Sequence, residues 1–246
     1  MNEEILSRYD IVPFIEDLKQ LGVFLNKRQM CQFLRYYELL VEWNGFMNLT
    51  AITDYREVMQ KHFIDSLSLA SFFNPEKGYS LIDVGTGAGF PGLPLKILFP
   101  DLQVTLLDSL NKRINFLNTL IDELSLSGIE TIHGRAEDFA KTGKKRAIYD
   151  LAVSRAVANL STLSEYCLPF VKTDGMFIAF KSEKTDEELN AAAHAIDVLG
   201  GEVFKVERFM LPSSDLSRSL IFIHKKKETP SRFPRKAGLP SKEPLV

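Results

Sequence analysis

The chain has 246 residues, of which 45% are hydrophobic and 25% charged, and its formal net charge is −2. This composition excludes disorder as the default and allows a sizeable core without disulfides. The cysteines, Cys31 and Cys167, are too few and too far apart for a disulfide framework or a cysteine-rich zinc site, and the histidines lack metal-ligand spacing. The start lacks a signal-peptide core, and no 18-residue apolar run occurs. We therefore expect a cytoplasmic protein with no metal and no membrane contact.

Residues 1–75 are predicted to be a helical extension that packs on the rest of the chain. Asn26 is a candidate N-cap for a helix whose apolar residues recur with the 3.6-residue period, and Asn44-Gly45 is its expected end. Asp54 is a candidate cap for a further helix through Phe63 and Leu67.

Strand and helix patterns alternate from residue 79 onward. Strands are predicted at residues 80–84, 104–107, 129–133, 151–153 and 175–180, followed by a close pair at 203–211 and 219–224. Helices are predicted at residues 93–99, after a cap at Asn111, and at 160–171 and 186–199. This alternation indicates an α/β fold over residues 76–225: a doubly wound, mostly parallel sheet with an antiparallel last strand.

Residues 226–246 form a basic segment with four prolines and few apolar residues, which we expect to be flexible and unstructured when free. Residues 224–246 contain seven basic and two acidic residues, whereas residues 1–223 carry −7, so any attraction to phosphate must be local. A basic loop at residues 141–146 is a second candidate for phosphate contact, and an ordinary solvated loop is equally compatible with its sequence.

A glycine-rich turn at residues 81–92, LIDVGTGAGFPG, is the most informative motif. Glycines such as Gly85 and Gly87, placed between a buried strand and a helix, allow close approach of a ligand to the backbone. Asp83 precedes the turn and suits a cationic ligand end better than a pyrophosphate. Asp108 follows 23 residues after Gly85, a spacing that suits contact with ribose hydroxyls. The motif favours S-adenosylmethionine over a nicotinamide dinucleotide or a turn without a ligand.

Two later segments are also predicted to reach the ligand. Arg155 ends the fourth strand, where ligands of doubly wound sheets bind, although a surface ion pair would explain it too. Glu137 follows the third strand and is a candidate acceptor for an adenine amino group, or simply a favourable acid at a helix start.

The motifs typical of other nucleic-acid methylases are missing. No Asn/Asp-Pro-Pro-aromatic run follows the fourth strand, and Cys167 lies in the middle of a predicted helix, so it does not suit the role of a cysteine nucleophile. The class of methyl acceptor that remains is a nucleophilic atom with no proton to remove, such as guanine N7.

Three basic residues can be explained without a catalytic or ligand-binding role. His62 is expected to be a satisfied interior histidine rather than a catalytic one. Lys112 and Arg113 oppose the dipole of their helix unless Asp108 or an anionic ligand compensates them.

Several ordered motifs together resemble the bacterial RsmG (GidB) methyltransferases. They are Trp43-Asn44 with Asn48-Leu49-Thr50, KHFIDS at 61–66, DVGTGAGFPG at 83–92, LDSLNKR at 107–113, Arg135-Ala136-Glu137 and Ser154-Arg155-Ala156. The resemblance runs almost end to end and includes the basic tail, which looks like that of Gram-positive members.

This resemblance implies a class I methyltransferase that moves a methyl group from S-adenosylmethionine to N7 of one guanine in small-subunit ribosomal RNA. It implies cofactor contacts at Gly85, Phe90, Ala136, Glu137 and Arg155, where Arg155 orients the reaction and no general base is expected. The substrate is the RNA or the ribosomal subunit, and we expect a monomer. A non-catalytic RNA-binding assembly factor and a nicotinamide-dependent oxidoreductase are the alternatives.

Overall fold

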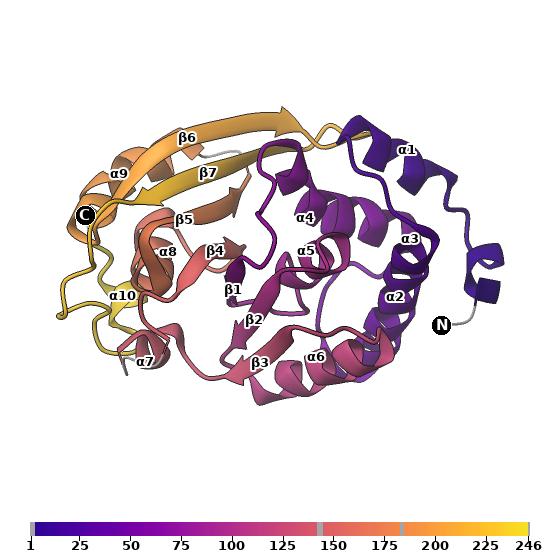
Figure 1. The fold of residues 1–246 in the computed structure, drawn as a ribbon, viewed down its shortest axis with the longest axis horizontal. Coiled ribbons are helices and arrows are strands. Elements are labelled where there is room, and N and C mark those ends of the chain that lie inside the picture. Colours follow the sequence, from indigo (N-terminus) through magenta and orange to yellow (C-terminus); the bar gives the residue numbers. More distant parts are fainter. Residues whose placement is uncertain (1–2, 142–144, 183–184, 246) are drawn as a thin grey trace.

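The computed structural model describes residues 3–141, 145–182 and 185–245. Within these ranges the fold is organised around one sheet with the order β3-β2-β1-β4-β5-β7-β6 (Figure 1). Its strands are β1 Ser80–Val84, β2 Gln103–Asp108, β3 Ile129–His133, β4 Tyr149–Arg155, β5 Val171–Lys181, β6 Gly201–Met210 and β7 Ser217–Lys225. β7 alone runs antiparallel to its neighbours, β5 and β6, while the pairs among β1 to β5 are parallel. The predicted fold class is confirmed.

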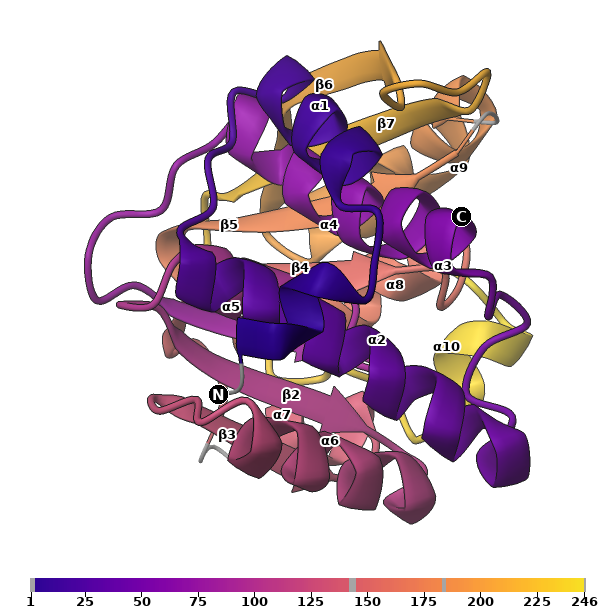
Figure 2. The same cartoon turned by 90° about the vertical axis from the view of Figure 1, so that its right-hand side faces the viewer.

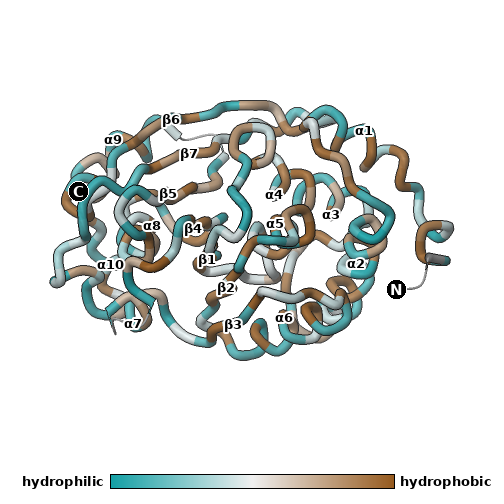
Figure 3. The backbone as a smooth tube through the Cα atoms, viewed as in Figure 1, coloured by the Kyte–Doolittle hydropathy of each residue, from teal (hydrophilic) through white to brown (hydrophobic). Residues whose placement is uncertain are grey.

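Helices cover both faces of this sheet and divide the core into two parts. One part lies under α2 (Lys27–Met47), α5 (Gly92–Leu98) and α6 (Asn111–Glu123), and the other under α7 (Ala136–Lys141), α8 (Leu160–Cys167) and α9 (Thr185–Val198). Strand residues alternate between them: Leu220 and Phe222 enter the first part, whereas Ile221 and Ile223 enter the second. Figure 3 shows how hydrophobic stretches recur along the central strands.

The N-terminal extension lies against one face of the sheet (Figure 2). It contains α1 (Val12–Gln20), α2, α3 (Tyr55–Val58), the π-helical segment η2 (Met59–Ile64) and α4 (Asp65–Leu67). Asn26 caps α2 in a reciprocal capping box with Gln29, and Asp54 caps α3 by accepting from the backbone N–H of Glu57, so both predicted caps are confirmed.

Two predicted helix limits are wrong. α2 passes through Asn44-Gly45 and ends at Asn48, which has a φ of 50°. Phe46 and Met47 continue the helical turn, and Asn tolerates the left-handed conformation that closes a helix. Asn111 is the first residue of α6 rather than its cap. The cap position is Leu110, which has no side-chain cap hydrogen bond and whose backbone N–H donates to Asp108.

An aromatic cluster joins the extension to the glycine-rich turn. Phe63 is fully buried and its ring lies 5.0 Å from Phe33, 5.1 Å from Tyr36 and 5.8 Å from Phe90. The Tyr36 hydroxyl donates to the carbonyl of Ala88 at 2.5 Å, inside the turn itself. The extension and the sheet therefore share one hydrophobic core.

The C-terminal tail differs from the flexible, unstructured segment expected from its sequence. Arg235 donates from its backbone and its guanidinium to Glu165 of α8, whose side chain is 0% exposed. Phe233 is buried, and Arg146 donates to its carbonyl at 2.8 Å. Composition alone misses this packing, because a few anchoring side chains and backbone carbonyls hold the tail down. Its short helix, α10 (Leu239–Lys242), lies beside α8 (Figure 1).

In the described ranges, no helix is both long and apolar enough to cross a membrane.

Phe63→Ala is expected to destabilise the protein strongly, because Phe63 is completely buried where the extension meets the sheet. Large-to-small changes at buried phenylalanines cost about 3–5 kcal/mol. Urea unfolding measures the change, and Phe24→Ala is the matched control, since Phe24 is 77% exposed. Equal stability of the two variants would contradict the shared core.

Candidate active site

The glycine-rich turn joins β1 to α5 with glycines in the left-handed region. Gly85 has a φ of +73° and Gly87 a φ of +62°, conformations that L side chains rarely adopt. A Cβ at Gly85 would lie 2.6 Å from Cγ2 of Val157, which belongs to the segment that follows β4. Gly85 thus leaves room for the Val157 side chain, and the predicted approach of a ligand to this backbone stays a prediction.

Asp83 lies under the glycine-rich turn and accepts hydrogen bonds from it. Its Oδ2 accepts from the Thr86 hydroxyl at 2.7 Å and from the backbone N–H of Gly92 at 2.8 Å, while its Oδ1 is buried with no partner among the described residues. Burial raises the pKa of Asp83 to about 6, although both hydrogen bonds oppose the shift. The side chain lies under the turn and is not among the residues that line the two cavities described below.

Asp108 ends β2 and connects three parts of the site. Its Oδ2 accepts from the backbone N–H of Gly87 at 2.9 Å and from Arg113 at 3.2 Å, and its Oδ1 accepts from Leu110 at 2.9 Å. Arg113 is thus compensated by Asp108, one of the two explanations open from the sequence. Lys112 donates to the carbonyl of Met47 at 3.1 Å.

A first cavity of about 470 Å³ opens beyond the carboxyl ends of β1, β2 and β3. Among the residues that line it are Gly85, Asp108, Ala136, Glu137 and, from the tail, Ser241. We call it the β2 cavity. Four residues predicted from the sequence to bind the cofactor therefore meet at one site.

Glu137 lies in the first turn of α7 and is 5% exposed. Its Oε1 accepts from the backbone N–H of Gly238 in the tail at 2.8 Å, whereas its Oε2 has no hydrogen-bond partner among the described residues. The tail thus holds this carboxylate in place at the wall of the β2 cavity.

Arg155 and Phe90 point away from the β2 cavity, toward the extension. Arg155 Nη1 lies 2.6 Å from Oδ2 of Asp65, and its guanidinium lies 5.0 Å from the ring centre of Phe90. Phe90 is stacked between Tyr36 and His62, at ring distances of 5.3 Å and 4.6 Å. Neither residue lines the β2 cavity, so their predicted cofactor contacts remain predictions.

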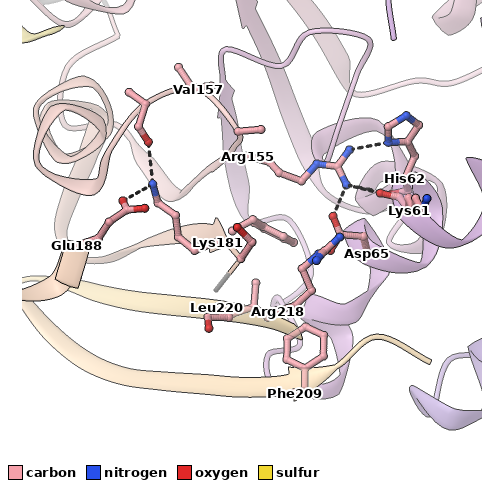
Figure 4. Close-up of a pocket in the computed structure, with 15 residues that line it drawn as sticks. Lys61, His62, Asp65, Arg155, Val157, Lys181, Glu188, Phe209, Arg218 and Leu220 are labelled. Carbon is pink, nitrogen blue, oxygen red and sulfur yellow. Dashed lines mark hydrogen bonds and ion pairs between the residues drawn. The ribbon is translucent and has the colours of Figure 1, made fainter. Parts of the chain in front are cut away.

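A second cavity, of about 570 Å³, lies on the other side of residues 156–158, which line both cavities. We call it the β7 cavity. Its wall includes Arg155 from β4, Lys181 at the end of β5 and Arg218 from β7, and Figure 4 shows these side chains around the opening. Cationic side chains thus gather directly beside the predicted cofactor site.

Asp65 and Arg218 were not singled out in the sequence. Asp65 is 5% exposed and its two oxygens pair with Arg155 and, at 2.9 Å, with Arg218 Nε. The only signal for Asp65 was its place in the KHFIDS motif, and Arg218 carried none, because the three residues meet only in the folded chain.

His62 is hydrogen-bonded and largely buried, as expected, yet it also lines the β7 cavity. Its Nε2 lies 2.9 Å from the Thr50 hydroxyl and its Nδ1 3.5 Å from Arg155. Burial, followed by the charge of Arg155, lowers the pKa of His62 to about 4. The imidazole is therefore neutral at physiological pH.

The basic loop is largely engaged within the protein. Lys145 pairs with Glu130 at 2.6 Å, and Arg146 donates to tail carbonyls, while residues 142–144, including Lys144, lie outside the described residues. Lys141 is exposed. Lys145 and Arg146 are thus engaged in contacts within the protein, and the choice between a phosphate-binding loop and a solvated loop stays a prediction.

No group of three or more His, Cys, Asp or Glu side chains in the described part of the chain is arranged to hold a metal ion.

The fold is that of class I methyltransferases. A putative methyltransferase solved with the Haloferax volcanii Trm112 activator aligns with a TM-score of 0.58 at 13% identity, covering 76% of this chain and 97% of that one. A SAM-dependent methyltransferase from Aquifex aeolicus aligns with a TM-score of 0.51 at 17% identity, covering 69% and 93%.

Sequence comparison places the chain within that class. The profile of the family rRNA small subunit methyltransferase G (GidB) matches residues 29–219. Proteins called ribosomal RNA small subunit methyltransferase G are 55% identical in Lachnoclostridium phytofermentans (96% of this chain, 98% of the relative) and 53% identical in Staphylococcus carnosus (94% and 97%). The chain belongs to the rRNA small subunit methyltransferase G family.

The neutral state of His62 predicts a pH dependence of stability. Since the pKa falls from 6.5 in the unfolded chain to about 4 in the fold, the unfolded state binds the extra proton between these values. Acidification from pH 7.5 to 5 should therefore cost the wild type about 1–2 kcal/mol more than His62→Gln. Urea unfolding of both proteins at each pH measures this difference, and a pH-independent difference would show that His62 is not held neutral.

Proposed function

We propose that this protein transfers a methyl group from S-adenosylmethionine to N7 of a guanine in small-subunit ribosomal RNA. The observation that carries the proposal is the convergence of Gly85, Asp108, Ala136 and Glu137 on the β2 cavity in a chain of the rRNA small subunit methyltransferase G family. The names of the relatives indicate an RNA substrate. The sequence has no Asn/Asp-Pro-Pro-aromatic run, and Cys167 is buried in α8 and does not suit the role of a nucleophile, which supports a ring nitrogen as the methyl acceptor.

The residues of the β2 cavity fit the adenosine part of this cofactor. The unpartnered Oε2 of Glu137 is an acceptor for an adenine amino group. Asp108, although it already accepts three hydrogen bonds, presents a carboxylate at the strand end where ribose hydroxyls bind in doubly wound folds. Asp83, with one buried oxygen unpartnered, supplies negative charge beneath the turn on which a cationic methionine end would lie.

The mechanism requires alignment rather than proton transfer. When bound, S-adenosylmethionine supplies an activated methyl group on a sulfonium, and the lone pair of guanine N7 is the nucleophile. This chain must then hold the acceptor nitrogen at near-attack distance, about 3–3.5 Å, without a general base. Arg155 is held by its ion pair with Asp65 and directly precedes residues 156–158, the segment between the two cavities. Its role in this proposal is to orient that segment. The neutral His62 contributes no positive charge that would oppose the cationic donor.

Residues 1–75 and 226–246 are proposed to act as parts of the same enzyme, which we expect to work as a cytoplasmic monomer. The extension supplies His62 and Asp65 to the β7 cavity, and the tail supplies Ser241 to the β2 cavity. The exposed cations of the tail, such as Arg232 and Lys236, are proposed to contact RNA phosphates, so RNA affinity should fall as salt rises. The family match does not favour the two alternatives, a non-catalytic RNA-binding assembly factor and a nicotinamide-dependent oxidoreductase.

Methyl transfer from labelled S-adenosylmethionine to protein-free small-subunit rRNA and to intact small subunits tests the function. The labelled base is then identified by nuclease digestion and chromatography. Labelled N7-methylguanosine is the expected product. Label on another base, or no label on either substrate, would contradict the proposal.

Glu137→Gln should weaken binding of S-adenosylhomocysteine about ten-fold or more, because a buried charge-assisted hydrogen bond is worth about 1.5–3 kcal/mol. Isothermal titration calorimetry measures the affinity. Asp138→Asn is the matched control, since Asp138 is the adjacent acid of α7 and is exposed. Equal affinities of the two variants would show that Glu137 does not contribute to cofactor binding.

A further inference from the structure

The β7 cavity carries two hydrogen-bonding groups that the fold positions but does not satisfy. Arg218 uses Nε for Asp65 and Nη1 for the carbonyl of Ser217, and its Nη2 has no partner among the described residues. Glu188 uses Oε2 for Lys181 and for the backbone N–H of Leu160, and its Oε1 is likewise without a partner in the described ranges. One free donor and one free acceptor thus line the same cavity.

These groups are held firmly in place. The side chain of Arg218 is 21% exposed and that of Glu188 is 29% exposed, and each is fixed by an ion pair, with Asp65 at 2.9 Å and Lys181 at 2.6 Å. Figure 4 places Glu188 and Arg218 on opposite sides of the cavity. A flat ligand between them would meet a donor at one end of its polar edge and an acceptor at the other end of that edge.

The remaining wall suits a nucleobase. Phe180, Phe209 and Leu220 supply apolar and aromatic surface, and the cavity volume of about 570 Å³ lies in the range of small-molecule sites. Residues 156–158 separate this cavity from the β2 cavity, so a base held here lies next to the proposed methyl donor.

We propose that the β7 cavity holds the extruded target guanine, with Arg218 donating to O6 and Glu188 accepting from N1–H and the 2-amino group. This inference rests on the proposed function and adds the residues that recognise the base. Arginine donation to guanine O6 is a recurrent means of recognition. Adenine would present an amino donor to Arg218 and an unprotonated N1 to Glu188, so the same pair disfavours it.

The variants Arg218→Lys and Glu188→Gln test this assignment, each with a matched neighbour. Arg208→Ala changes an arginine of the adjacent strand that is 50% exposed, and Glu187→Gln changes the exposed acid next to Glu188. Arg218→Lys keeps a cation beside Asp65 while shortening its reach, so the fold is expected to survive. Melting temperature and S-adenosylhomocysteine affinity are measured on every variant.

The decisive readout is single-turnover methyl transfer to the small-subunit substrate that the wild type methylates. Arg218→Lys and Glu188→Gln should lower the second-order rate constant about ten-fold or more, with S-adenosylhomocysteine affinity within two-fold of wild type. Arg208→Ala and Glu187→Gln should match the wild type.

Three outcomes overturn the assignment. If both test variants transfer the methyl group at rates within two-fold of wild type, Arg218 and Glu188 do not recognise the base. A fall of about one in the slope of log RNA affinity against log salt for Arg218→Gln, which removes the charge, would show that Arg218 binds a phosphate. A wild type that binds S-adenosylhomocysteine but methylates neither rRNA nor subunits would overturn the proposed function, and this inference with it.

Discussion

The carboxylate of Asp65 is the constraint on which the arrangement of the site depends. It comes from the N-terminal extension and is paired with Arg155 at the end of β4 and Arg218 near the start of β7. Because its side chain is only 7% exposed, loss of both arginines would leave a buried charge without compensation, at a cost of about 3–5 kcal/mol. The ion pairs therefore fix the extension on the sheet and set the orientation of both guanidinium groups. Fold and recognition depend on the same three side chains.

Much of the fold could be predicted from the sequence, because local patterns determine it. The apolar residues of β1 and the capping box at Asn26 are encoded by neighbouring residues, and strand–helix alternation leaves few possible topologies. The glycine-rich turn and Asp108 could be predicted for the same reason: parallel strands place their carboxyl ends along one edge. Helix limits were less certain, because Asn48 ends α2 in a left-handed conformation and Leu110 precedes α6 without a side-chain cap, and the apolar pattern indicates neither.

The remainder of the site could not be predicted, because it depends on contacts between residues far apart in the sequence. Arg218 joins Asp65 across 153 positions, and Glu137 joins the tail at Gly238 across 101 positions. Composition also suggested a flexible tail, yet Glu165 buries its charge against Arg235 and holds that segment on α8. Such pairings follow from the folded topology, so neither hydrophobic period nor motif spacing indicates them.

The hydrogen bond between Tyr36 and the carbonyl of Ala88 has a consequence for protein engineering. A methyl group at Gly89 would lie 2.5 Å from the Tyr36 hydroxyl, so the turn packs against α2 with no room for a side chain at this position. The methyltransferase sheet is thus not an interchangeable module. A chimera that joins another family's N-terminal extension to this sheet must also carry a surface that accommodates residues 88–90, or the glycine-rich turn loses the helix that it packs on.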